Sequence, residues 1–316
     1  ELFAIDLTSG DRTILSDTST GSGANLSTPS NIALDIANNR ALVVDSTLDA
    51  VFAIDLANGD RTIISNDTIG AGDKLRFPKG IDFDSVNERA LLVDRLLGTV
   101  ISIDLNTGDR SALADVGAGS LLLRPDSITM DSANNRALVV DSDFDLPALV
   151  AIDLSSGDRT ILSGGSTGSG DNLTSPQSVA LDSTNNRALV VDSSQAELFA
   201  IDLTSGDRTI LSNISTGSGI NLKLPRSVAL DSTNNRALVV DSNLDALVAI
   251  DLDTGDRTII ADDSTGTGPK LSTPLSITLD ITNHVALVTN SDSSIAATNA
   301  VVIIDLATGE RAIASK

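Results

Sequence analysis

A repeat of about 49 residues runs through the chain and constrains its fold more than any other feature. A string close to A-I-D-L-x-x-G-D-R recurs with its aspartate at Asp6, Asp55, Asp104, Asp153, Asp202, Asp251 and Asp305. A second string, P-x-x-[IV]-x-[LFM]-D, recurs with its proline at Pro29, Pro78, Pro125, Pro176, Pro225 and Pro274. Such a period is typical of repeat architectures, in which each unit covers the apolar surface of its neighbours.

Each repeat predicts four short strands. In the copy that starts at Pro225 they are Ser227–Asp231, Ala237–Asp241, Leu247–Leu252 and Arg257–Ala261. These runs are rich in Val, Ile, Leu and Thr and are bounded by turn formers. Gly255 lies between the third and fourth strands and favours a tight hairpin at positive φ. The second strand is almost continuously apolar, which indicates a sheet buried on both faces. The prediction is an all-β propeller of four-stranded antiparallel blades.

The number of blades has two interpretations, because the chain opens directly on a third strand. Seven third-and-fourth-strand pairs stand against six first-and-second-strand pairs. This favours seven blades, with the first two strands of the first blade upstream of residue 1. A six-bladed ring, with the first hairpin serving elsewhere, is the alternative. The expected division of the single domain 1–316 is a half-blade with linker over 1–28, then blades over 29–77, 78–124, 125–175, 176–224, 225–273 and 274–316.

Composition excludes several classes of function. The 316 residues include no Cys, Trp or Tyr and one His, so disulfides, thiolate chemistry and Cys-based zinc sites are ruled out. The formal net charge is −22, which would repel a phosphate backbone, and aromatic stacking platforms are missing. We therefore expect no nucleic-acid partner. No apolar run is long enough for a membrane-spanning helix.

The segment Ala286–Arg311, which reads ALVTN…VVIIDLATGER, resembles the YVTN repeat of surface-layer-type propellers. The strings P-x-x-[IV]-A-L-D and A-L-V-V-D-S are also similar to NHL and YWTD repeats. The resemblance implies a secreted or cell-surface propeller that acts as a non-catalytic binding or scaffold module for a protein or a small polar ligand. It also includes a gluconolactonase-like branch, so a metal-dependent lactonase or hydrolase with its site at the channel mouth is the alternative. A structural repeat in a larger surface protein is a third possibility.

Residues that differ between near-identical copies are the best candidates for function, because residues shared by every copy build the blade. The position after the blade-opening proline holds Ser30, Lys79, Asp126, Gln177, Arg226 and Leu275. In gluconolactonase-like propellers this position supplies metal ligands to the channel. Here it offers one carboxylate and two cations, which argues against a metal. We predict instead that Lys79, Asp126, Gln177 and Arg226 form a polar channel mouth that binds a small anionic or polar ligand.

The best metal candidate is the run Asp141-Ser142-Asp143-Phe144-Asp145, which resembles the opening of a calcium loop. The match is partial, because Leu146 and Ile152 replace the Gly and Glu of the full pattern. Calcium bound by Asp141, Asp143 and Asp145 is thus the one cofactor that the sequence suggests.

The remaining recurrent polar residues are predicted to be structural. One aspartate ends the second strand of each copy and is expected to accept backbone N–H bonds: Asp45, Asp94, Asp141, Asp192 and Asp241, with Asn290 in the last copy. The recurrent arginine after the hairpin glycine is assigned to the scaffold. The Gly-rich linkers, such as Ser166–Gly170, lack the order of a phosphate loop and are expected to be flexible connectors.

Overall fold

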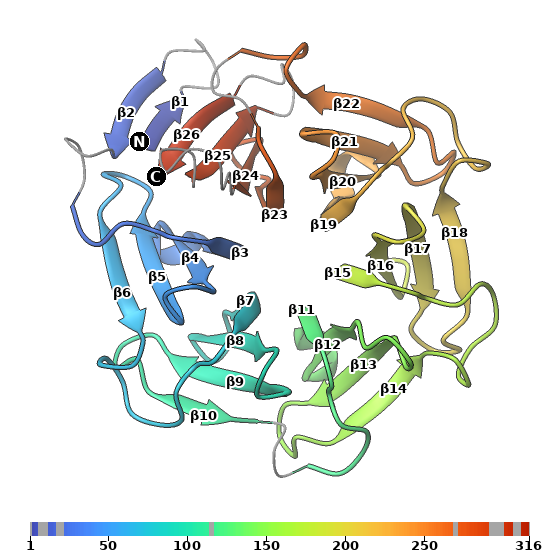
Figure 1. Ribbon diagram of the computed structural model, residues 1–316, viewed down its shortest axis with the longest axis horizontal. Coiled ribbons are helices and arrows are strands. Elements are labelled where there is room, and N and C mark those ends of the chain that lie inside the picture. The colour runs from blue at the N-terminus through green and yellow to red at the C-terminus, as the bar shows by residue number, and fades with distance from the viewer. Residues whose placement is uncertain are drawn as a thin grey trace.

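The computed structural model describes residues 2–5, 12–16, 22–113, 117–267, 271–290, 300–305 and 311–315, and side chains are described for 22–113, 117–267 and 271–290. In these ranges the chain forms six four-stranded antiparallel sheets around a central axis, with one separate two-stranded sheet (Figure 1). The only helices described are three single 3-10 turns, η1 (Ile36–Asn38), η2 (Ser132–Asn134) and η3 (Ser232–Asn234). The prediction of an all-β propeller with four-stranded antiparallel blades is confirmed.

The strands follow the repeat, running in order from the channel outward. The first two blades are β3 (Pro29–Asp35), β4 (Arg40–Asp45), β5 (Ala50–Asp55) and β6 (Arg61–Ser65), then β7 (Pro78–Asp84), β8 (Arg89–Asp94), β9 (Thr99–Asp104) and β10 (Arg110–Ala112). The next two are β11 (Pro125–Asp131), β12 (Arg136–Asp141), β13 (Ala148–Asp153) and β14 (Arg159–Ser163), then β15 (Pro176–Asp182), β16 (Arg187–Asp192), β17 (Glu197–Asp202) and β18 (Arg208–Ser212). The last two are β19 (Pro225–Asp231), β20 (Arg236–Asp241), β21 (Ala246–Asp251) and β22 (Arg257–Ala261), then β23 (Pro274–Asp280), β24 (Val285–Asn290), β25 (Ala300–Asp305) and β26 (Arg311–Ser315).

The favoured count of seven blades is wrong. The inner strands lie side by side in chain order, and β23 lies beside β3, which closes the ring (Figure 1). Five blades are described in full, and the sixth sheet has described side chains only in β23 and β24. The first hairpin, β1 (Leu2–Ile5) with β2 (Arg12–Ser16), forms the two-stranded sheet and lies against β26. Because β3 already covers the free face of the last blade, the ring has no room for a seventh inner strand.

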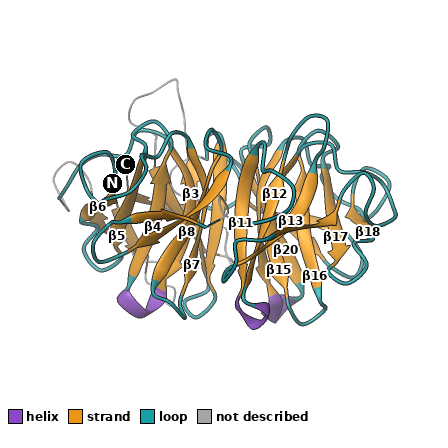
Figure 2. Cartoon of the chain, turned by 90° about the horizontal axis from the view of Figure 1, so that it is seen from below, coloured by secondary structure: helices purple, strands orange, loops and turns teal. Residues whose placement is uncertain are grey.

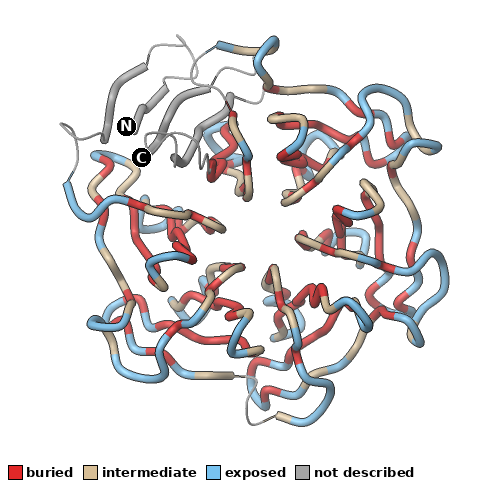
Figure 3. Tube along the Cα trace, viewed as in Figure 1, coloured by how far each residue is buried: buried red, intermediate tan, exposed pale blue. Residues whose placement is uncertain are grey.

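The core is a series of apolar layers between adjacent blades. Successive residues of β16 alternate between them, so Val190 packs toward β12 and Val191 packs toward β20. Both valines are fully buried, and burial of such a side chain stabilises the fold by about 1.5–3 kcal/mol. Figure 3 shows these buried residues in the middle of the described blades. Two buried faces explain why the second strand is apolar throughout instead of alternating with polar residues.

The two faces of the ring carry different connections between the strands. The 3-10 turns, which join the first and second strands, lie on one face, here called the turn face (Figure 2). On the opposite face, here called the linker face, lie the linkers that enter each blade and the loops between second and third strands (Figure 2). The inner strands therefore all begin at the linker face, and so do the residues that follow the blade-opening prolines.

The aspartate at the end of the second strand is structural, as predicted. Asp241 is fully buried and accepts hydrogen bonds from the backbone N–H groups of Lys223 and Leu224 at 2.7 and 3.0 Å. It also accepts from the N–H groups of Asn243 and Leu244 in its own loop, at 3.0 and 3.1 Å. One carboxylate thus holds the end of the linker and the second-to-third-strand loop together.

Where the structure describes them, the linkers are held by hydrogen bonds, which contradicts the expectation that they are flexible connectors. Arg208 donates hydrogen bonds to the carbonyls of Thr167 and Asp171 at 2.9 and 2.7 Å, and to the Ser163 hydroxyl at 2.7 Å. A Cβ on Gly168 would lie 1.9 Å from the carbonyl oxygen of Gly206 in the next blade. These glycines allow backbones of adjacent blades to approach closely, which a side chain would prevent.

We predict that Asp241→Ala lowers the free energy of unfolding by about 2–3 kcal/mol, because four backbone donors lose their acceptor. Asp241→Asn should cost less, since the last copy carries Asn290 here and its side-chain oxygen accepts from the Ser272 N–H at 2.8 Å. The measurement is denaturant unfolding followed by circular dichroism, with the exposed Asp253→Ala as control. An Asn variant as damaged as the Ala variant would contradict this account.

Candidate functional site

A β-bulge places the residue after each blade-opening proline. In β19, Pro225 pairs with Asp241 and Ser227 with Val240, so Arg226 has no partner residue on β20. The same irregularity occurs in four other inner strands, and in β7 it leaves both Lys79 and Gly80 without a partner residue on β8. A bulged residue leaves the regular alternation of the strand, so its side chain does not belong to either buried face of the sheet. Four of these residues were the predicted polar mouth: Lys79, Asp126, Gln177 and Arg226.

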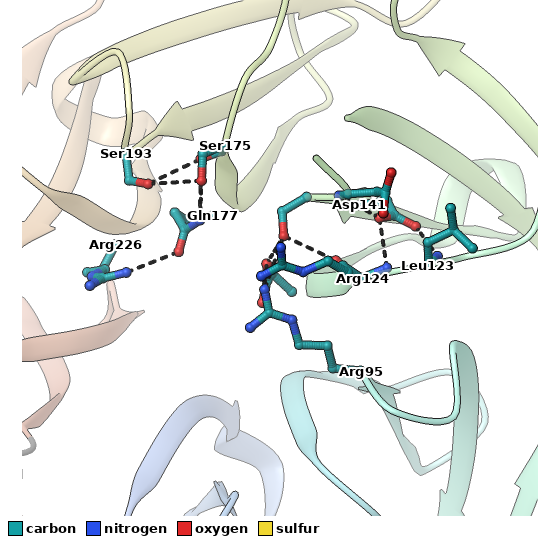
Figure 4. Close-up of polar contacts among 11 residues, drawn as sticks. Arg95, Leu123, Arg124, Asp141, Ser175, Gln177, Ser193 and Arg226 are labelled. Atoms are coloured by element: carbon teal, nitrogen blue, oxygen red, sulfur yellow. Dashed lines mark hydrogen bonds and ion pairs between the residues drawn. The ribbon is translucent and has the colours of Figure 1, made fainter. Parts of the chain in front are cut away.

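On one side of the mouth, Arg226 and Gln177 join two blades. The guanidinium of Arg226 donates to the side-chain oxygen of Gln177 at 3.3 Å (Figure 4). It also donates to the Ser242 hydroxyl at 3.1 Å. Gln177 in turn donates from its amide to the carbonyl and hydroxyl oxygens of Ser175, at 3.3 and 3.1 Å. The partners of Arg226 here are neutral, so its positive charge is not paired within this network.

On the other side of the mouth, the structure adds Arg95, which the sequence analysis missed. Its guanidinium donates to the Asp126 carboxylate at 3.3 Å and to the Ser142 hydroxyl at 3.4 Å (Figure 4). The Ser142 hydroxyl also donates to the Asp126 carboxylate. The sequence did contain a signal, because Arg95 occupies the position after the strand-ending Asp or Asn, where all five other copies carry Ser: Ser46, Ser142, Ser193, Ser242 and Ser291.

Lys79 is the third cation of the mouth. Burial lowers the pKa of its ammonium group, and the charges of Arg95 and Arg226 lower it further, while Asp126 opposes the shift. Its ammonium lies 5.1 Å from the centre of the Phe77 ring, a weakly favourable contact. Burial likewise lowers the pKa of Arg226, with Asp126 and Asp241 opposing. Three cations therefore share one carboxylate, in a chain whose net charge is −22.

A cavity of about 350 Å³ lies in the channel next to the mouth. Its wall includes one residue directly after the mouth position in five blades: Asn31, Ser127, Ser178, Ser227 and Ser276. The hydroxyl of Ser178 accepts from the Val228 N–H at 3.2 Å, so these side chains also link inner strands. These five side chains are polar and neutral.

Asp82 is the acidic residue of this cavity wall, and the sequence analysis missed it too. It accepts from the N–H groups of Phe83 and Met130, both at 2.8 Å, and from the Thr129 hydroxyl at 3.3 Å. Burial raises its pKa, and these hydrogen bonds oppose the shift. Its position was again visible in the repeats, since the other copies carry Ala33, Thr129, Ala180, Ala229 and Thr278 there. Its bonds hold two inner strands together.

The predicted calcium ligands do not converge. Asp141 accepts from the N–H groups of Leu123 and Arg124 at 2.6 and 2.9 Å, like the other aspartates of its series (Figure 4). Asp143 accepts from the N–H groups of Asp145 and Leu146 within its own loop. Among the residues that the structure describes, no three His, Asp or Glu side chains form a group suited to a metal ion. The donor set thus does not fit calcium at this loop.

Comparison with known proteins supports the fold and leaves the family open. No family model matches the sequence, and no curated protein is similar to it. Among solved structures, the chain is similar to one from a nidogen/laminin complex, with a TM-score of 0.61 and 19% identity over 73% of this chain and 78% of that one.

Two bacterial structures are also similar. A gluconolactonase from Xanthomonas campestris aligns with a TM-score of 0.65 and 13% identity, over 84% of each chain. A protein of unknown function from Bacteroides thetaiotaomicron aligns with a TM-score of 0.64 and 13% identity, over 86% of this chain and 71% of that one. At these identities the likeness shows a β-propeller and does not carry activity across. No helix in the described part of the chain could span a membrane.

The charges of the mouth predict how Lys79 titrates. Its pKa should lie below the ordinary value for lysine, since burial and two guanidinium groups disfavour the ammonium form. Arg95→Ser should raise this pKa by removing a positive neighbour, and Asp126→Asn should lower it by removing the negative one. NMR titration of the lysine ammonium groups measures these shifts, with the exposed Lys74 as internal control. A lower pKa in Arg95→Ser, or a higher pKa in Asp126→Asn, would overturn the geometry described here.

A second prediction concerns metal. Because Asp141 and Asp143 are engaged by backbone N–H groups, excess EDTA and then millimolar Ca²⁺ should leave the thermal midpoint unchanged to within about 1 °C. A ligand bound to the native state at about 100 times its Kd stabilises it by about 2.7 kcal/mol, which such a scan detects. A calcium-dependent rise that Asp143→Asn abolishes would instead restore the calcium site of Asp141, Asp143 and Asp145.

Proposed function

We propose that the protein is a non-catalytic binding module whose channel mouth binds a small anionic ligand through a carboxylate or phosphate group. One observation carries the proposal: Lys79, Arg95 and Arg226 gather around the single carboxylate of Asp126. Among the described residues, Asp126 is the only carboxylate in ion-pair contact with any of the three. The site thus keeps a surplus of positive charge that an anion would neutralise.

Three features make this surplus suited to recognition. Guanidinium groups present several N–H donors in a plane, which matches the oxygens of a carboxylate or phosphate. The partial burial of Lys79 and Arg226 reduces screening, so their attraction for an anion exceeds that of exposed side chains. The acidic surface elsewhere makes the mouth the place where an anion is least repelled. Association should be sensitive to salt for the same reason.

The alternative function is a metal-dependent lactonase or hydrolase. The fold is similar to that of a gluconolactonase, but the mouth lacks the oxygen ligands that a metal ion would need. A hard divalent cation needs several converging oxygen ligands, and here cations surround the one carboxylate of the mouth. A binding role agrees better with these residues. We also propose a secreted or cell-surface location, on the strength of the acidic composition and the repeats that resemble surface-layer propellers.

The proposal predicts that citrate raises the thermal midpoint by a few degrees at constant ionic strength, and that chloride at the same ionic strength does not. Arg95→Ser and Arg226→Gln should each weaken citrate binding about tenfold or more, because each removes a charged hydrogen-bond donor. Calorimetric titration measures the affinity, and inorganic phosphate tests the second anion class.

Lys74→Asn is the matched control. Lys74 is an exposed cation that forms an ion pair with Asp67 and none with the described mouth residues, and three other copies carry Asn25, Asn172 and Asn221 at its position. This variant should bind citrate like the unaltered protein. Equal loss of binding in Lys74→Asn and Arg95→Ser would mean that only overall charge matters, and absence of any citrate or phosphate effect would refute the proposed site.

A further inference from the structure

Exposed apolar side chains gather on the linker face of the second and third blades, beside the mouth. They are here called the leucine patch: Leu96, Leu121, Leu123, Phe144 and Leu146, with 72, 73, 48, 82 and 67% of their surface exposed. Single exposed apolar residues are ordinary, but a group of this size on one face is typical of an interaction surface.

Backbone and side-chain contacts bring the parts of the leucine patch together. The loop that carries Leu96 touches the linker of the third blade, since a Cβ on Gly98 would lie 2.5 Å from the Leu122 carbonyl oxygen. The guanidinium of Arg124 lies 4.0 Å from the centre of the Phe144 ring, so the end of this linker also contacts the loop 142–147. The patch therefore spans two loops and the linker between them.

Comparison between copies shows that the fold does not require these apolar side chains. The position of Leu123 holds Ser27, Arg76, Thr174, Lys223 and Ser272 in the other copies, and that of Leu121 holds Asn25, Lys74, Asn172, Asn221 and Lys270. The backbone role is the same with either kind of side chain. The N–H of Leu123 donates to Asp141 at 2.6 Å, just as the N–H of Lys223 donates to Asp241 at 2.7 Å. The apolar side chains thus expose surface to water without a gain for the scaffold.

The loop of the third blade adds to the same surface. It runs from Ser142 to Pro147, two residues longer than the loop Ser242–Asp245 at the same place in the fifth blade. Asp143 accepts hydrogen bonds from the N–H groups of Asp145 and Leu146 at 3.1 and 3.3 Å, which holds the turn that presents Phe144. An ordered loop reduces the entropy that a partner must overcome on binding.

The charged residues around the leucine patch indicate the chemistry of its partner. Arg95 and Arg124 lie within or beside it, and Lys79 stands at the adjoining mouth, against Asp126 of the mouth and Asp143 and Asp145 of the loop. A second copy of the chain is a poor occupant, because each copy carries a net charge of −22. An apolar segment with acidic side chains satisfies both the leucines and the arginines.

We infer that the leucine patch and the mouth together bind an extended, acidic and apolar peptide segment of a partner protein. Its apolar side chains cover Leu121, Leu123 and Phe144, and one of its carboxylates enters the mouth. The inference rests on the proposed function, because that carboxylate is the anion that Lys79, Arg95 and Arg226 bind. Apolar contact supplies affinity, and the charged contact fixes orientation.

The test is selection of a random peptide library against the whole protein, with competitive washing by the variant Leu121→Asn/Leu123→Thr/Phe144→Ser. The first two substitutions take residues that other copies carry at those positions. Recovered peptides should combine Leu, Ile or Phe with Asp or Glu. Synthetic copies of them should bind the variant at least tenfold more weakly than the unaltered protein by fluorescence anisotropy, and Asp→Asn copies should also bind more weakly.

Val86→Thr is the matched control, because Val86 is an apolar residue 73% exposed on the turn face, where other copies carry Thr. It should leave peptide affinity unchanged. Citrate binding by the triple variant distinguishes the anion site at the mouth from the peptide site. If the triple variant binds citrate but no longer binds the peptides, both proposals are supported. Citrate binding without any patch-dependent peptide overturns the inference and spares the proposed function. Loss of both ligands in a properly folded triple variant, or concentration-dependent dimerisation through the patch, also overturns it.

Discussion

The structure depends on the need of every blade to cover both faces of its sheet. The second strands are apolar on both sides, so each sheet requires a neighbour on the left and on the right. A ring satisfies this requirement for all blades at once, and β23 beside β3 completes it. Closure also brings the starts of the inner strands to one mouth, where the bulged residues of different blades meet.

The backbone N–H and C=O groups of the linkers and loops also need hydrogen-bond partners. Two recurrent side chains, an aspartate and an arginine, supply them. Buried aspartates such as Asp241 accept hydrogen bonds from the linker and the loop, and arginines such as Arg208 donate to linker carbonyls. Since the scaffold relies on these constant residues, positions between them vary at little cost to stability. The mouth residues and the leucine patch are such positions, and both lie on the linker face.

Several elements followed from the sequence alone. The apolar second strand, the hairpin glycines and the aspartate series predicted the four-stranded blade and the role of Asp241, because these are local consequences of burial and backbone geometry. Comparison of copies also indicated Lys79, Asp126, Gln177 and Arg226. The same comparison, applied at every position, would have found Arg95 and Asp82, which stand where other copies carry Ser, Ala or Thr.

The sequence by itself determined the type of unit, since strand pattern, turn residues and buried partners lie within one repeat. The tertiary structure decided how many units close the ring, because closure depends on the angle between packed sheets, and no single repeat contains that angle. It also decided which distant side chains meet. Arg95 reaches Asp126 and Arg124 reaches Phe144 only because adjacent loops converge at the linker face, whereas Asp141, Asp143 and Asp145 are near in sequence and yet do not converge.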